Sequence, residues 1–518
     1  MAIYKSEPVA VPGTLPSPPP RWRMVPAITP VSALAASVIL TVLIQGYAGA
    51  ALRGLYADGA YFVTRLAEHR PRVQPGRVIS GWIAEWPVVA AMHLDLETPH
   101  SVALAFSLVS NLLPGLIILL CLPAIPTGEK QFFIFPCFVY FAGILSAQFA
   151  SVTEGLIATS YFWLLLCLIA FGRLTMLRLV LIAVLAVGCL DMHEQMSFLG
   201  PVLVAGCAMR WRYERGLLSR MVLSAAVLSA LASTVIAANY VFHPFDVVER
   251  DGFVSDFLTL KWLYQADVGW NLPCVLGILA VPCILIATVR PAWGIAASWI
   301  FVALSVPLAL AAFWLDWLIA PFSQFAARHN GALMSLPLAV LLLFARRHAP
   351  LATAMNRRSA RRIVVVLGLT VSLWHVAATE QWSAFLTHFS NVLQSRGGII
   401  AWDSVVAPPG SRQAEFARKM VWGWTNPDLS LVALPRSCVN SVIANPTGRF
   451  RWEPHTLSNL ATCRRSRASL IPISCHWMSS VPRARRAVHP EPEWRRRTGE
   501  PGLFFGADVK SRKQPHAK

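Results

Sequence analysis

Charge is what this sequence has least of. Only 14% of its 518 residues are Asp, Glu, Lys or Arg, whereas a soluble domain carries about 25%. Its ten cysteines include no Cys-x-x-Cys pair, and most fall inside apolar stretches, which argues against a zinc site or a disulfide framework. These deficits exclude an ordinary soluble protein and a small disulfide-stapled one.

We also expect no cleavable signal sequence at the N-terminus. Residues 1–26 are polar and Pro-rich, and the apolar run that follows is about as long as a full membrane span. A run of that length is expected to remain as an uncleaved anchor.

What the chain does contain is long apolar runs. It is 55% hydrophobic, with a mean hydropathy of +0.53. Roughly 20 apolar residues cross a hydrocarbon core about 30 Å thick. The continuous runs therefore predict an all-α polytopic membrane protein with about 11 transmembrane helices. We place them at 27–48, 101–125, 131–149, 152–171, 174–190, 196–208, 221–241, 272–289, 293–314, 331–344 and 363–378.

Basic and acidic residues alternate between successive loops. Because positive residues favour the cytoplasmic side, the pattern predicts a cytoplasmic N-terminus and, with an odd number of spans, a periplasmic C-terminus in a bacterial-type inner membrane. The first outer loop is the exception, since it also holds Arg65, Arg70, Arg72 and Arg77. The predicted cytoplasmic loops carry Arg21, Arg23, Lys130, Arg173, Arg210, Arg212, Arg215, Arg220, Arg290, Arg346, Arg347, Arg357, Arg358, Arg361 and Arg362.

Four regions follow from this pattern. They are a Pro-rich cytoplasmic N-terminus (1–26), a transmembrane domain (27–379), a small exported region (380–457) and a basic tail (458–518). The transmembrane domain has long outer loops at 53–100 and 242–271. An interrupted apolar piece of the first loop, 78–94, carries Trp82 and Trp86, so we expect juxtamembrane helices on the outer surface there.

The tail has no apolar periodicity and is rich in Arg, Ser and Pro. It is typical of a disordered segment or of a shifted reading frame, and we assign it no function. Thirteen of the 45 Lys and Arg residues and four of the 26 acids lie in the last sixty residues. Much of the net charge of +19 is therefore concentrated there, and the rest orients the loops, so we expect no nucleic-acid partner.

Two acidic residues stand at the predicted outer ends of spans. Asp58 follows the first span, where a carboxylate partly shielded from water can act as a general base; a solvated acid at a helix end is the alternative. Glu154 begins an apolar span with almost no other charge nearby. An acid there is costly and usually faces a cavity or a partner, although an acid in a first helical turn also gains from the helix dipole.

A short outer loop carries Asp191, His193 and Glu194. The His-Glu pair suggests zinc, but the zincin pattern requires a second His where Ser197 stands, so we expect no metal site. The loop is either a simple polar turn or a wall of the same outer cavity as Glu154.

Arg328 and His329 precede a span on the predicted outer side. An Arg in that place runs against the positive-inside bias, and arginine binds phosphate through parallel hydrogen bonds. We expect either a lipid phosphate or the carboxylate of Asp316 as its partner.

The arrangement resembles the integral-membrane glycosyltransferases of the C superfamily, which include the dolichyl-phosphate-mannose and lipid A aminoarabinose transferases. The stretch Asp58-Gly59-Ala60-Tyr61-Phe62 is similar to their Asp-Glu-x-x-Tyr element. The segment 70–77, which is basic and contains proline, is similar to a basic, Pro-containing segment that lies later in those enzymes. Glu154-Gly155-Leu156 resembles their second outer-loop acid.

Later elements extend the resemblance over roughly 27–343. His193, which precedes Leu199-Gly200-Pro201, is similar to a polar element that precedes a Gly-Pro pair in the family. Arg328, which precedes Leu336-Pro337-Leu338, is similar to a late arginine that precedes an apolar Leu-Pro run. The chain departs from the family at Gly59, which replaces the second acid, and at the usual lysine, for which Arg77 is the nearest cation.

The resemblance implies a membrane glycosyltransferase that takes a sugar from a polyprenyl-phosphate donor at the outer face. Asp58 and Glu154 would be its catalytic acids: the first accepts the proton of the attacking hydroxyl, and the second positions the acceptor or a divalent cation. The implied partners are the lipid-linked donor and membrane lipids, and apart from that divalent cation the cofactor is left unassigned. The implied substrate-binding residues are Arg77, Glu85, His193, Glu194, Arg328 and His329.

Three alternatives remain open. A transporter or lipid flippase would show inverted repeats and helices broken at the midplane, whereas the acids here gather at one interface. A polysaccharide polymerase or ligase would rely on basic outer loops, which the first outer loop provides. A non-catalytic membrane protein would tolerate neutral residues in place of Asp58 and Glu154.

Overall fold

The computed structural model describes residues 30–56, 58–67, 77–94, 99–148, 154–243, 272–314, 324–395, 399–402, 405, 425–432 and 441–443. All of these belong to one compact unit, Met1–Ile471; the second unit, Pro472–Lys518, lies outside the described residues, as do the N-terminal segment 1–26 and the outer-loop stretch 244–271.

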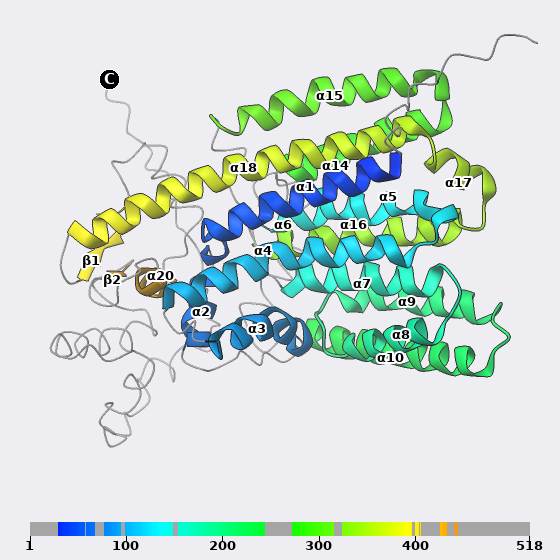
Figure 1. Cartoon of the computed structure of the whole chain (residues 1–518), viewed down its shortest axis with the longest axis horizontal. Coiled ribbons are helices and arrows are strands. Elements are labelled where there is room, and N and C mark those ends of the chain that lie inside the picture. Colours follow the sequence, from blue (N-terminus) through cyan, green and yellow to red (C-terminus); the bar gives the residue numbers. More distant parts are fainter. Residues whose placement is uncertain are drawn as a thin grey trace, which may run out of the picture. The chain divides into compact units, whose positions relative to one another are not determined.

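The described chain is almost entirely helical (Figure 1). Its helices run in order as α1 (Pro30–Ala50), α2 (Gly59–Ala67), α3 (Val78–Met92), α4 (Pro99–Ala124), α5 (Ile134–Phe138), α6 (Leu145–Ala147), α7 (Glu154–Ala170), α8 (Met176–Gly188), α9 (Met196–Trp211), α10 (Leu217–Phe242), α14 (Leu272–Val289), α15 (Gly294–Ala311), α16 (Gln324–Ala345), α17 (Ala349–Met355), α18 (Arg358–Ser395) and α20 (Asn426–Val432). Shorter 3-10 turns include η1 (Arg53–Leu55) and η2 (Thr127–Phe133), and a π-helical turn, η3, covers Val139–Ile144.

Seven of the described helical segments are long and apolar enough to cross a membrane: 31–50, 100–124, 127–147, 217–242, 272–289, 291–311 and 358–395. This confirms an all-α membrane protein as the fold class. The other expected spans fall on shorter apolar helices, which are α7, α8, α9 and the part of α16 from Asn330 to Ala345.

The segment 127–147 forms the centre of the bundle and is nearly all buried. It joins η2, α5, η3 and α6, and the π-helical turn packs against α14, α16 and α18. A Cβ on Gly143 would lie 2.8 Å from the Cα of Gly331. Two glycines therefore let the backbones of η3 and α16 approach closely, as small residues do between membrane helices.

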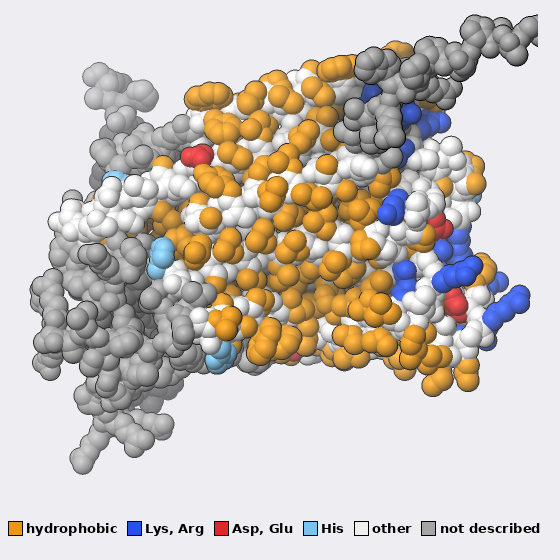
Figure 2. All heavy atoms as spheres, in the orientation of Figure 1, with side chains coloured by type: hydrophobic (Ala, Val, Ile, Leu, Met, Phe, Trp, Pro, Cys, Tyr) orange, Lys and Arg blue, Asp and Glu red, His pale blue; other side chains and the backbone are white. Residues whose placement is uncertain are grey.

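Charge divides the bundle into two ends. In Figure 2 hydrophobic side chains cover the middle, and Lys and Arg side chains gather at the end where α17 lies. We call this the basic end; hydrogen bonds from Arg210 to the Gly172 carbonyl and from Arg347 to the Met209 carbonyl hold its connections together. Its only acids among the described residues are Glu129 and Glu214.

The opposite end, which we call the acidic end, collects most of the described carboxylates. Its connections are also tied together, for example by Ser80 Oγ donating to the Met192 carbonyl and Trp382 Nε1 donating to the Leu52 carbonyl. The acids found there are Asp58, Glu85, Glu154, Asp191, Glu194 and Glu380, together with Asp428 on α20, which packs against α2.

The first long loop contains the two short helices α2 and α3. α3 packs on α4 and α7, and Trp82 and Trp86 stack on its exposed side with ring centroids 5.4 Å apart. Tryptophans exposed beside an apolar bundle are typical of the membrane interface. That α3 lies on the membrane surface stays a prediction.

The last long helix, α18, continues past residue 379, where the sequence places the end of the transmembrane domain, and ends at Ser395. Beyond it, β1 (Ile399–Ala401) pairs in parallel with β2 (Ser441–Ile443), and α20 packs against α2. Part of the region expected to be exported therefore contacts the acidic end.

Candidate active site

The N-terminus of α3 is docked onto the connection between α8 and α9. The Ile79 amide donates to the Asp191 carbonyl at 3.2 Å, and Ser80 Oγ donates to the Met192 carbonyl at 2.6 Å. Asp191 has a φ of 53°, in the left-handed region, which Asp tolerates better than most residues. This turn brings an acceptor to one of the N–H groups that a helix start leaves without an intrahelical partner.

Docking places Arg77, the residue before α3, between two glutamates from distant parts of the chain. Its Nε lies 2.7 Å from Glu194 Oε1, and its Nη1 lies 3.6 Å from Glu154 Oε2. Arg77 and Glu154 are buried, and Glu194 is mostly so. Three of the residues predicted to bind or act on substrate therefore meet at the acidic end.

Electrostatics fixes the charge of Glu194. Burial is the largest single influence and opposes its ionised form, but the charges of Arg77 and His193, together with hydrogen bonds to the carboxylate, outweigh burial and lower the pKa of Glu194 to about 2. A carboxylate that accepts a charge-assisted hydrogen bond from a buried guanidinium is strongly held in its charged form. Glu194 is therefore a fixed anion at neutral pH.

His193 completes the cluster. Its Nδ1 lies 3.2 Å from Glu194 Oε2 and 3.3 Å from the Gln195 amide nitrogen. A neutral ring with a bare Nδ1 accepts from the amide, whereas a protonated ring donates from Nδ1 to the carboxylate. The geometry thus offers His193 two hydrogen-bonded states that differ by one proton.

Neutral residues that the sequence analysis did not select as site residues support the charged ones. Gln195 is fully buried, and Thr159 Oγ1 donates to its Oε1 at 2.9 Å. A Cβ on Gly155 would lie 2.9 Å from Gln195 Nε2 and 3.3 Å from His193 Nε2. The missing side chain at Gly155 is what lets α7 pack directly on these two residues.

Asp58 occupies a different place at the acidic end. It precedes α2, and its carbonyl accepts the Phe62 amide at 3.0 Å, so it stands at the helix N-cap, a position that favours Asp. It is buried. A Cβ on Gly59 would lie 1.8 Å from the Gly54 carbonyl oxygen. The second acid of the resembled motif is thus sterically excluded in this backbone.

The remaining predicted residues lie on α3 and α16. Glu85 is buried two turns along α3, on the helix side that also carries Gly81, Val88 and Met92. Arg328 and His329 fall in the first turns of α16, and their side chains lie outside the described residues.

A buried arginine that the sequence reasoning did not single out lies between α1, α4 and α18. Arg53 is 0% exposed, and its Nη2 donates to Gln45 Oε1 at 2.8 Å and to Asn111 Oδ1 at 3.2 Å. Its Nη1 donates to Thr379 Oγ1 at 3.0 Å and to the His375 carbonyl at 3.3 Å. Burial lowers the pKa of Arg53 to about 10, so it stays charged at neutral pH. The available signal was an Arg on the predicted outer side, five residues before Asp58.

A divalent cation fits this site poorly. Within the part of the chain that the structure describes, no group of three or more His, Cys, Asp or Glu side chains could hold a metal ion. Glu154 and Glu194 already face the guanidinium of Arg77, and a metal ion would have to compete with that fixed cation.

Comparisons with protein-family models, with curated proteins and with solved structures give no match for this chain.

Proposed function

We propose that this chain is a membrane glycosyltransferase that moves a sugar from a polyprenyl-phosphate donor to an acceptor at the outer, periplasmic face of the inner membrane. The observation that carries the proposal is the convergence of Arg77, Glu154, His193 and Glu194, from three separate segments, into one buried ionic cluster at the acidic end of an apolar bundle. Ionisable groups buried at a membrane protein's polar end are costly and are usually retained for function.

The proposed reaction is a direct displacement at the anomeric carbon of the donor. The acceptor oxygen forms the new bond to that carbon while the bond to the donor's phosphate oxygen breaks, and the hydroxyl proton passes to the Asp58 carboxylate. The polyprenyl phosphate leaves as an anion. Asp58 suits the role of base because it is buried, yet anchored by its own backbone at the start of α2.

The charges of the Arg77 cluster indicate which substrate it would bind in this reaction. Among the described residues of the cluster, Arg77 contributes one positive charge beside the carboxylates of Glu154 and Glu194, so these three side chains offer an added phosphate no net positive charge. We therefore place the acceptor at Glu154, with Arg77 and Glu194 as the pair that holds this carboxylate in position. The donor phosphate is assigned to Arg328, with Glu85 and His329 beside the substrates.

The membrane arrangement belongs to the same proposal. Eleven passes result if α1, α4, the 127–147 segment, α7, α8, α9, α10, α14, α15, α16 and α18 each cross once. The basic end is then cytoplasmic, and the acidic end, the C-terminal region and the reaction lie on the periplasmic side.

Native mass spectrometry with undecaprenyl phosphate tests donor binding. Wild type, Asp58→Asn, Glu154→Gln and Arg328→Ala are compared, with Arg215→Ala as the control, because Arg215 is exposed at the basic end. We expect saturable binding that is lost with Arg328→Ala and kept with Asp58→Asn and with the control. No specific binding in any variant would overturn the proposal and favour a transporter or a scaffold.

A second assay separates transfer from transport. Protein is incubated with an extract of polyprenyl-phosphate sugars, and the release of free polyprenyl phosphate is followed by mass spectrometry. We expect release by wild type and a loss on the order of 10²–10⁴-fold in Asp58→Asn, which is the usual contribution of a general base. A flippase binds these lipids but releases no sugar from them.

A further inference from the structure

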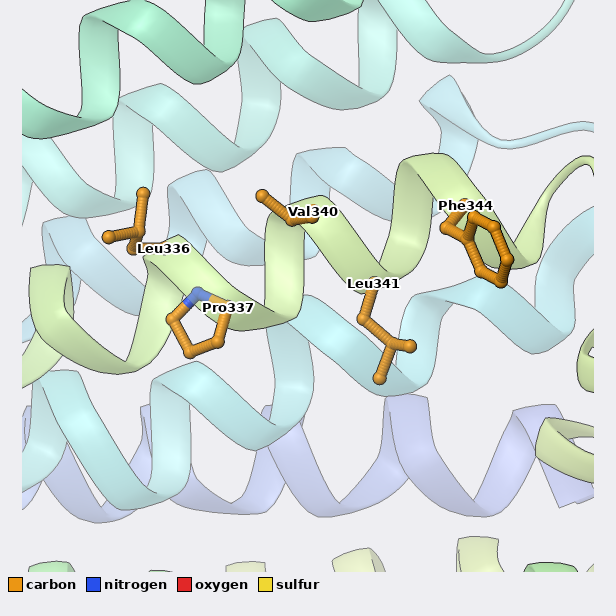
Figure 3. Close-up of a pocket in the computed structure, with 5 residues that line it drawn as sticks. All are labelled: Leu336, Pro337, Val340, Leu341 and Phe344. Carbon is orange, nitrogen blue, oxygen red and sulfur yellow. The ribbon is translucent and has the colours of Figure 1, made fainter.

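One apolar groove lies on the membrane-facing side of α16. It has a volume of about 470 Å³ and is lined by Leu336, Pro337, Val340, Leu341 and Phe344, which follow one another along a single helix (Figure 3). The side of α16 that packs into the bundle carries other residues, including Ser335, Ala339 and Leu342. The groove is therefore open to the surrounding membrane rather than to the interior of the protein.

The groove is the right length for one leaflet. Leu336 and Phe344 are eight residues apart, which is about 12 Å along a helix, and half of a hydrocarbon core is about 15 Å. It occupies the second half of α16, which ends at the basic end. Pro337 has no N–H to donate to the Leu333 carbonyl, so the helix is locally weakened where the groove begins.

Basic and aromatic residues lie directly beyond Phe344, where the groove ends at the basic end. The His348 ring stacks on Phe344 with centroids 4.9 Å apart, and both are exposed. The Arg347 guanidinium lies over the Tyr213 ring at 5.0 Å and donates one hydrogen bond, at 3.3 Å, to the Met209 carbonyl. This leaves most of its five N–H donors for a ligand at the membrane surface.

The charge of Arg347 indicates which kind of lipid headgroup would bind at the end of the groove. The two acids at the basic end are already engaged: Glu214 lies 2.6 Å from Arg210 Nε, and Glu129 lies 3.9 Å from Arg346 Nε. Among the described residues, Arg347 has no carboxylate partner. An uncompensated arginine beside an apolar groove at a membrane surface attracts a lipid phosphate.

We infer that α16 carries a binding site for an anionic phospholipid of the leaflet at the basic end. One acyl chain lies in the groove from Leu336 to Phe344, and the headgroup phosphate binds Arg347. The site is separate from the proposed donor site, because the donor is expected at the acidic end. The inference rests on the membrane character of the chain and not on the proposed reaction.

Native mass spectrometry of detergent-purified protein tests the site, with phosphatidylglycerol and phosphatidylcholine of identical chains as probes. Arg347→Gln removes the headgroup contact, and Val340→Phe fills the groove. The matched controls are Arg215→Gln, at the same end, and Val235→Phe on α10; Val235 is 67% exposed and Val340 54%. Both valines face outward, so neither Phe disturbs the interior.

We expect one phosphatidylglycerol to remain on the wild type. Arg347→Gln should weaken its retention by about fivefold, the effect of one Lys or Arg contact near a charged surface. Val340→Phe should abolish retention, and both controls should leave it unchanged.

Three results would overturn the inference. Equal retention of phosphatidylglycerol by all variants would mean that lipid binds nonspecifically around the protein. Equal retention of phosphatidylcholine would mean that the site does not distinguish the headgroup. Displacement by undecaprenyl phosphate means that the groove belongs to the donor.

Discussion

Arg77 Nε and Glu194 Oε1 meet at 2.7 Å although 117 positions separate the two residues in the chain. This ion pair joins α3 to the connection between α8 and α9, and it is largely shielded from water. Breaking a buried pair by removing one partner costs about 3–5 kcal/mol, because the other charge is left without compensation. The pair therefore serves both the stability of the acidic end and the placement of its carboxylates.

The first prediction concerns the loss of this cation. Arg77→Gln should lower the melting temperature strongly, because Glu194 loses the guanidinium 2.7 Å from its carboxylate and Glu154 loses the same cation at 3.6 Å. The double variant with Glu194→Gln should recover part of the loss. Melting in detergent, followed by fluorescence-detected size exclusion, measures both, and Arg215→Gln is the surface control. A melting temperature equal to that of the control would show that the pair contributes little.

The second prediction concerns pH. The pKa of Glu194 is lowered from 4.5 to about 2 in the folded protein, so its contribution to stability is fully present above about pH 4.5. It is lost as pH falls toward 2 and is on the order of 3 kcal/mol. Melting temperatures should fall more steeply between pH 5 and about 3 in wild type than in Glu194→Gln. Parallel curves for the two proteins would contradict the depressed pKa.

The third prediction concerns the close packing at Gly155. Gly155→Ala should displace Gln195 and His193, because the new methyl would lie 2.9 Å and 3.3 Å from their side-chain nitrogens. Overpacking of this kind typically costs about 1–3 kcal/mol. Gly128→Ala is the matched control, since nothing lies within 4 Å of a Cβ there. Equal melting temperatures for the two alanine variants would argue against close packing at Gly155.

Comparing these residues shows how far sequence could lead to the site. Arg77, Glu154, His193 and Glu194 could be selected because each is ionisable and stands at the end of an apolar run. Gly155, Gln195 and Thr159 could not, because neutral residues inside such runs resemble ordinary helix residues. That Arg77 faces two glutamates rather than a phosphate depends on how α3 docks, and no spacing in the sequence encodes this.

The fold, like the site, has features that the sequence predicts and features that only the structure shows. Apolar runs located the helices, because membrane burial requires them. The end of α18 was not visible, since the helix continues from residue 379 to Ser395 through a polar stretch that no longer resembles a span. Gly59 is similar: its departure from the resembled motif is plain in the sequence, but its reason, the Gly54 carbonyl beside it, is visible only in three dimensions.

The fourth prediction concerns Arg53. Arg53→Lys should destabilise the protein almost as much as Arg53→Met, because a single ammonium cannot reach Gln45, Asn111 and Thr379 at once as a planar guanidinium does. We expect a loss of several hydrogen bonds to a charged group, each worth about 1.5–3 kcal/mol. Melting temperature is the measurement, with Arg215→Lys as control. If Arg53→Lys melts like wild type, the fork of hydrogen bonds is not needed.

The fifth prediction concerns orientation and uses one cysteine at each end. The cysteines in the described residues are all buried, so Arg215→Cys at the basic end and Glu380→Cys at the acidic end report on their own sides. In intact cells a membrane-impermeant maleimide should label Glu380→Cys and leave Arg215→Cys unlabelled until the membrane is permeabilised, because basic residues favour the cytoplasmic side. Wild type treated in the same way measures the background from all native cysteines. The opposite labelling pattern would place the Arg77 cluster in the cytoplasm, where a periplasmic sugar transfer could not use it.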